Sequence, residues 1–60
     1  MEHFSPCWIV FEEDGYDGCP PHPIKVFTDR DKAYDYYSFR IRNNVVDGIE
    51  YTIEESELEV

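Results

Sequence analysis

Apolar and polar residues along the chain form patterns that predict four secondary-structure elements. Two short apolar runs are typical of strands, a later segment alternates apolar and polar positions as a half-buried strand does, and one segment repeats apolar residues at helical spacing. The predicted elements are strands at 7–13, 24–27 and 49–54 and a helix at 29–40, with a loose arm at 1–6, a loop at 14–23 and an acidic tail at 55–60. All of them fit one small domain, because 60 residues can bury only a marginal core.

The helix is expected to begin directly after Thr28. The Thr28 hydroxyl can accept hydrogen bonds from the first helical turn, and Asp31 can accept one from the Thr28 N–H, which makes a capping box with Asp in place of Glu. The residues expected to face the core are Ala33, Tyr36, Tyr37 and Ile41. Arg40 falls on the same stripe, so either the helix ends near Ser38 or Arg40 extends along the core edge towards an acid.

A right-handed crossover through the helix places the third strand beside the first and antiparallel to it. The expected fold is therefore α+β, a ββαβ chain whose three-stranded antiparallel sheet has the order 2-1-3 and carries the helix on one face. The residues assigned to the helix side are Ile9, Phe11, Ile24, Val26, Tyr51 and Ile53. Trp8, Val10 and Phe27 would then lie on the open face, where an exposed apolar cluster commonly marks an interface.

Acidic residues are concentrated at the C-terminal end of the chain. The formal net charge is −9, all five basic residues lie between positions 25 and 42, and residues 45–60 carry only negative charge. Such a segment is repelled by nucleic acid and anionic membranes and is attracted to basic protein surfaces. The carboxylates expected to form a partner-binding edge are Glu50, Glu54, Glu55, Glu57 and Glu59. The alternative is that these acids keep a small, aromatic-rich protein soluble.

The alternation of the third strand is expected to break after Glu54. Ile49, Tyr51 and Ile53 point inward in this pattern, whereas Leu58 has the outward parity of Glu50. The tail is therefore expected to bulge or to leave the sheet near residues 55–56.

Four residues of types that bind zinc occur within the first 22 positions: His3, Cys7, Cys19 and His22. Their spacing matches no standard zinc finger, and an extended strand separates the two pairs, so no metal or other cofactor is expected. The same separation favours free thiols over a disulfide between the two cysteines. No nucleophile lies beside a base, and no glycine-rich phosphate loop is present, so no enzyme is expected.

The remaining segments bear on partners and location. The basic residues are offset by Asp31 and Asp35 in the helix, so direct nucleic-acid binding is not expected. The loop at 14–23 is either an ordinary connection or a partner-binding loop that carries Tyr16 and His22. The longest apolar run has five residues, so neither a signal peptide nor a membrane span is expected and the cytoplasm is the expected location.

The segment Val26-Phe-Thr-Asp-Arg-Asp-Lys-Ala-Tyr-Asp-Tyr-Tyr37, preceded by the strand around Trp8 and a loop containing Tyr16, resembles a group of very short phage and prophage proteins. These share a first strand, a loop, a "VFTD-EKA" strand-to-helix junction and a final acidic strand. The resemblance covers most of residues 7–55 and brings no catalytic residues. The topology is also similar to small phage inhibitors of host enzymes. Together with the row of carboxylates, this similarity predicts a non-catalytic protein-binding module, in the form of a phage-encoded inhibitor that mimics DNA on the basic, nucleic-acid-binding surface of a host protein. A self-associating homodimer is the other expectation.

Overall fold

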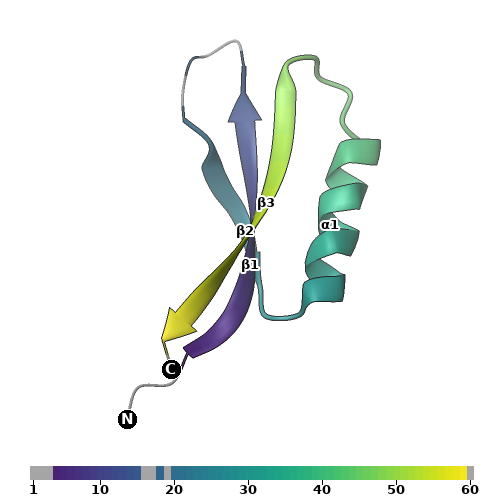
Figure 1. Cartoon of the computed structure of the whole chain (residues 1–60). Coiled ribbons are helices and arrows are strands. Elements are labelled where there is room, and N and C mark those ends of the chain that lie inside the picture. Colours follow the sequence, from purple (N-terminus) through teal and green to yellow (C-terminus); the bar gives the residue numbers. More distant parts are fainter. Residues whose placement is uncertain (1–3, 16–17, 19, 60) are drawn as a thin grey trace.

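The structure, a computed structural model, describes residues 4–15, 18 and 20–59. Its elements are β1 (Phe4–Asp14), β2 (His22–Phe27), α1 (Arg30–Arg42) and β3 (Ile49–Glu59). The strands form an antiparallel sheet in the order β2-β1-β3, and α1 packs on one face of it (Figure 1). The predicted α+β fold and strand order are therefore confirmed.

β1 and β3 pair over their whole lengths, and this corrects two predictions about the chain ends. The register runs from Phe4 opposite Glu59 to Asp14 opposite Ile49. Residues 4–6 are therefore strand rather than a loose arm, and residues 55–59 are strand rather than a tail that leaves the sheet. Pro6 is tolerated because β2 pairs with β1 only as far as Trp8, so the β2 side of Pro6 needs no ladder donor.

β2 begins at His22, two residues earlier than predicted, so His22 belongs to a strand and not to the loop. Its register against β1 shifts between Val10 and Phe11, whose partners are Lys25 and Pro23. Proline fits here because β2 is an edge strand and because the register shift leaves Ile24 between these two pairs.

α1 begins one residue later than the predicted cap implies. Asp29 is the N-cap, and its Oδ1 accepts hydrogen bonds from the N–H groups of Asp31 at 2.9 Å and Lys32 at 3.2 Å. The capping role predicted for Thr28 was therefore wrong, because the adjacent aspartate takes it with a charged acceptor. The helix continues past Ser38 to Arg42 and ends at Asn43, whose Nδ2 donates to the Phe39 carbonyl at 2.8 Å.

The sheet face that α1 covers is the reverse of the predicted one. Val10 and Ala33 are both 0% exposed, and the Phe27 and Tyr36 rings lie 5.4 Å apart, so the helix packs on the side of β1 that carries Trp8 and Val10. Tyr51 and Ile53 were assigned correctly, since they pair with Glu12 and Val10. The placement of Trp8, Val10 and Phe27 on the open face was wrong, because both parities of β1 are apolar and only the register decides between them.

The buried stripe of α1 follows the prediction except at its C-terminal end. Ala33 is buried, and Tyr36 and Tyr37 are half-buried, whereas Ile41 is 47% exposed. Ile41 was expected in the core, but Arg40 occupies the side of the helix that faces the sheet there. Among the described residues, no helix is both long and apolar enough to cross a membrane.

Candidate binding surfaces

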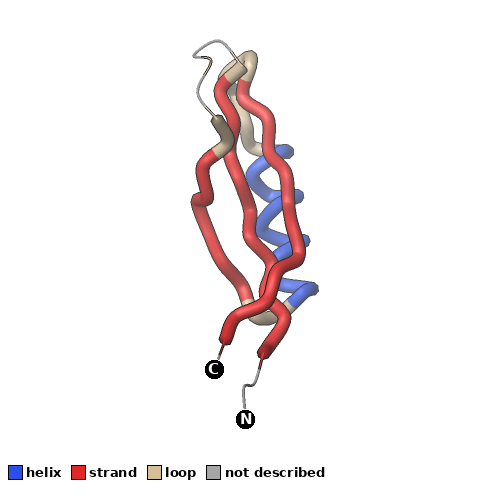
Figure 2. The backbone as a smooth tube through the Cα atoms, turned by 60° about the vertical axis from the view of Figure 1, so that its left-hand side comes forward, coloured by secondary structure: helices blue, strands red, loops and turns tan. Residues whose placement is uncertain are grey.

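The sheet face opposite α1, called here the open face, has an apolar part formed by two strands. Ile9 and Phe11 of β1 have the parity opposite to Val10, and Val26 of β2 pairs with Ile9. Ile24 is half-buried and lies at the register shift of β2, between the residues that pair with Val10 and Phe11. Ile9 and Phe11 are half-buried and Val26 is 51% exposed, and no described element packs on this side of the sheet (Figure 2). These residues were predicted to lie under the helix.

Acidic residues border this apolar part. Glu54 of β3 pairs with Ile9, and Glu50 pairs with Glu13, so all three carboxylates project on the open face. Two like charges directly opposite each other in neighbouring strands destabilise the sheet slightly. The open face thus joins an apolar area to a carboxylate row along its β3 side.

The remaining acids of β3 lie on the other side of the same strand. Glu55 pairs with Trp8 and Glu57 with Pro6, so both share the side of the sheet on which α1 packs. The ends of β1 and β3 extend past the start of α1, which leaves this side uncovered there (Figure 1). The backbone of Glu59 pairs with Phe4, and its side chain lies outside the described part of the structure. The predicted acidic edge is therefore divided between two faces of one edge strand.

Cations are absent from the described residues of β3 and of the open face. Lys25 pairs with Val10 and so lies on the α1 side of the sheet, and the other four basic residues belong to α1. Within α1, Arg40 forms an ion pair with Glu12 of β1. Glu50 and Glu54 therefore share their face with no cation, whereas Glu55 and Glu57 lie on the side of the sheet that carries Lys25 and α1. All four side chains are exposed.

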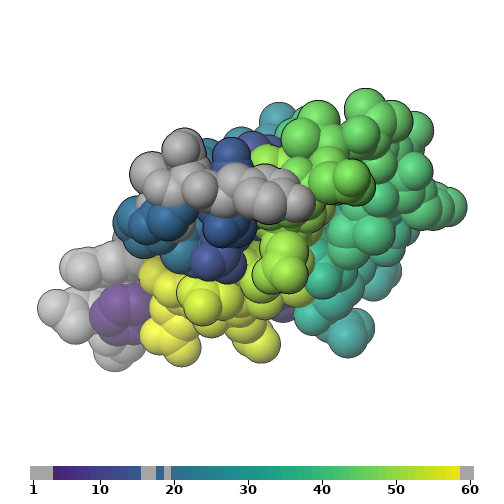
Figure 3. Space-filling model, turned by 90° about the horizontal axis from the view of Figure 1, so that it is seen from above, coloured from purple at the N-terminus to yellow at the C-terminus, as the bar shows by residue number. Residues whose placement is uncertain are grey.

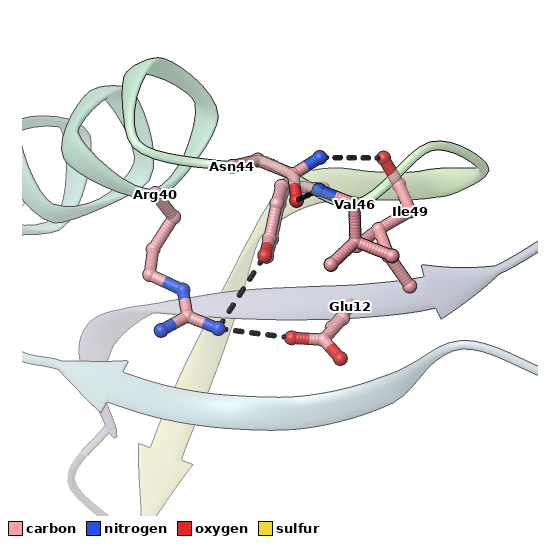
Figure 4. Close-up of polar contacts among 6 residues, drawn as sticks. Glu12, Arg40, Asn44, Val46 and Ile49 are labelled. Carbon is pink, nitrogen blue, oxygen red and sulfur yellow. Dashed lines mark hydrogen bonds and ion pairs between the residues drawn. The ribbon is translucent and has the colours of Figure 1, made fainter.

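Arg40 connects α1 to the centre of the sheet (Figure 4). Its Nη2 donates to Glu12 Oε2 at 3.0 Å and to the Tyr51 hydroxyl at 3.4 Å, and its guanidinium lies 5.3 Å from the centre of the Tyr51 ring. Desolvation lowers the pKa of Arg40, but the interactions with Tyr51 and Glu12 raise the pKa by more, so it lies above its ordinary value. The expectation that Arg40 extends towards an acid is confirmed.

A hollow of about 320 Å³ lies beside this cluster. Its polar residues include Glu12, Arg40 and Tyr51, and its apolar residues are Phe39, Val45, Val46 and Ile49. Asn44 secures the turn above it, since its Oδ1 accepts from the Val46 N–H at 3.1 Å and its Nδ2 donates to the Ile49 carbonyl at 3.5 Å (Figure 4). Because Arg40 engages both the carboxylate of Glu12 and the phenol of Tyr51, the cluster fixes the helix against the sheet and leaves neither group as an unpaired base.

The other predicted site residues are not brought together. Cys7 is a free thiol, 1% exposed, with the parity of the open face, whereas His22 pairs with Glu12 and so has the opposite parity. Five strand positions separate Cys7 from Glu12, or about 16 Å. His3, Cys19 and Tyr16 lie outside the described residues. Within the described part of the chain, no three His, Cys, Asp or Glu side chains cluster as a metal site.

The upper surface of the molecule shows how the elements combine. Seen from above, α1 forms one side of the molecule, and the start of β3 lies between it and the end of β1 (Figure 3). Trp8, Val10 and Phe27, which were expected to form a dimer face, belong to the side of the sheet that carries α1. Val10 is fully buried there, and Trp8 and Phe27 are half-buried. The residues of the open face were predicted wrongly because both sides of β1 are apolar, and the register of β1 decides which side is exposed.

No protein-family model, curated protein or solved structure matches this chain.

Proposed function

We propose that this chain is a non-catalytic protein-binding module that occupies a basic surface of a partner protein, of the kind that otherwise binds nucleic acid. The observation that carries the proposal is the distribution of charge on β3. This edge strand presents exposed carboxylates on both of its sides, and the cations of the chain lie on α1 and on the α1 side of β2. A partner lined with Arg and Lys would meet carboxylate acceptors along β3 and no cation on the open face.

The spacing of these carboxylates supports the same function. Residues two apart in a strand lie about 7 Å from each other on one face, so Glu55 and Glu57 form a regular pair, and Glu50 and Glu54 lie roughly twice as far apart. The strand holds them in a fixed row because β3 pairs with β1 along its full length. A preformed row pays less entropy on binding than the same acids in a flexible tail.

The resemblance to short phage proteins supports a more specific version of this function. A phage-encoded chain of this kind would act in the host cytoplasm as an inhibitor that competes with DNA for a host protein. Negative charge on a small rigid scaffold is what such competition requires, because the basic surface binds phosphates largely through charge.

Neutralising the carboxylates of β3 is expected to abolish most of the binding. The variant E54Q/E55Q/E57Q should lose capture of basic proteins from host lysate, measured by quantitative mass spectrometry of pulldowns, and duplex DNA should elute the same proteins from the wild type. The matched control is D31N/D35N/D47N, which removes three charges away from β3 and should retain capture. If the β3 variant captures the same proteins as the wild type, the acids serve solubility and the proposal is wrong.

A further inference from the structure

The open face has an apolar area with charged residues at its border, as one side of a protein–protein interface does. Its apolar part consists of Ile9, Phe11 and Val26, and a carboxylate row borders it on the β3 side. A packed layer shields an apolar sheet face from water, and an apolar area left without such a layer commonly marks an interaction site. α1 provides that layer on the other side, and no described element provides it here (Figure 2).

A second copy of this chain does not fit the open face. A homodimer through this face would collect Glu13, Glu50 and Glu54 of both copies in one interface, and each chain already carries a net charge of −9. Like charges opposed across an interface are strongly unfavourable. The occupant must therefore be apolar in part and positively charged.

The pairing of Glu13 with Glu50 gives a second reason for a cationic occupant. These two carboxylates are directly opposite each other in neighbouring strands, with no basic residue on the same face. A Lys or Arg side chain placed between them would replace a repulsive contact with two attractive ones.

We propose that the open face docks an amphipathic helix of the partner, whose apolar stripe packs on Ile9, Phe11 and Val26 and whose basic flank reaches Glu50 and Glu54. This inference rests on the proposed function and assigns it a surface and a ligand. The dimensions agree, because Ile9 and Phe11 are about 7 Å apart, close to the roughly 6 Å between helix positions i and i+4. Glu50 and Glu54 are about 13 Å apart, between two and three helical turns.

The test uses a synthetic 16-residue peptide with leucines at positions i, i+4, i+7 and i+11 and lysines along one flank. Its fluorescein-labelled form is titrated with the wild-type protein, and its affinity is measured by anisotropy and its helicity by circular dichroism. The peptide is expected to become helical on binding, and a scrambled peptide of the same composition is expected to bind at least about tenfold more weakly, because it lacks the apolar stripe.

Two matched variants locate the binding site. Val26→Lys puts a cation in the centre of the open face, and Val46→Lys makes the same change at a residue of similar exposure, 51% against 58%, in the connection between α1 and β3. V26K is expected to weaken peptide binding about tenfold, and V46K by less than about threefold. Both substitutions are at exposed positions, and the far-ultraviolet spectrum checks that each variant folds.

The alternative outcomes separate this inference from the proposed function. Equal binding of the ordered and scrambled peptides, or equal losses in V26K and V46K, would show attraction to charge without docking on the open face, and the β3 carboxylates would still account for capture. Absence of peptide binding would overturn the docking inference alone. A wild-type dimer in sedimentation equilibrium that V26K dissociates would assign the open face to self-association instead.

Discussion

Replacing Val10 by alanine is expected to lower the free energy of unfolding by about 2 kcal/mol, whereas the same change at Val26 is expected to cost less than about 0.5 kcal/mol. Val10 is 0% exposed in the central strand beneath α1, and Val26 is 51% exposed on the open face. Loss of two methyl groups leaves a cavity at the first site and removes little buried surface at the second. Urea unfolding of both variants, followed by circular dichroism, measures the difference.

The two valines form an internal control, because both are in paired strands and undergo the same chemical change. The opposite face assignment, with Val26 under the helix and Val10 exposed, predicts the reverse order of stability. Equal losses at the two positions would mean that neither face is shielded, and the two-layer arrangement would then be wrong.

Deleting residues 55–60 is expected to lower the free energy of unfolding by about 3 kcal/mol, which could unfold so small a domain. The deletion removes five β1–β3 pairs, from Phe4 opposite Glu59 to Trp8 opposite Glu55. It also removes the strand that pairs beside Cys7, a side chain that is only 1% exposed. The measurement is the urea midpoint of the truncated chain against the full chain.

Charge requires its own control, since the deletion also removes three glutamates. The full-length variant E55Q/E57Q/E59Q keeps the strand and loses the same charges, and it should be at least as stable as the wild type because repulsion in an acidic chain falls. A truncated chain as stable as the full one would show that these residues are a tail that contributes nothing to the sheet.

The elements and their order could be predicted from the sequence because local patterns encode them. Adjacent cap formers at Thr28 and Asp29 mark the helix start within one residue, and the alternation from Ile49 to Ile53 marks the core side of β3. A right-handed crossover from β2 through α1 then places β3 beside β1. These features depend on residues close together in the chain.

The helix-covered face could not be predicted, because it depends on register. β1 is apolar at both parities, and a shift of one residue against β3 exchanges its two faces. The β1–β3 pairs join positions separated by α1 and β2, so no tight turn sets their alignment. The β2 register contains an irregularity beside Phe11, and Pro23 at that point is as typical of an edge strand as of a bulge, so it does not predict the shift.

The acidic end of β3 was misread for a related reason. Leu58 has the parity of Glu50 and Glu54, and this pattern predicted that the strand stops before it. β3 instead continues to Glu59, and what changes along the strand is whether α1 covers its α1 side. The strands extend past the start of α1, so the α1 side of the sheet is uncovered there (Figure 1). By their pairing, Glu55 and Glu57 lie on this uncovered side, and the buried Cys7 has the opposite parity. The α1 side of β3 therefore changes from covered to uncovered where α1 begins, and the sequence pattern does not show where on the sheet that point lies.

The most direct test of the central claim, that the partner binds the open face and not the side under α1, is the response of valine methyl NMR signals to the basic amphipathic peptide. The chain supplies Val26 on the open face, Val10 on the covered face, and Val45 and Val46 in an exposed connection. The predicted result is a saturable shift of the Val26 methyl signals while those of Val10, Val45 and Val46 stay in place. Shifts at Val10 without Val26, or equal shifts at all four, would contradict the claim.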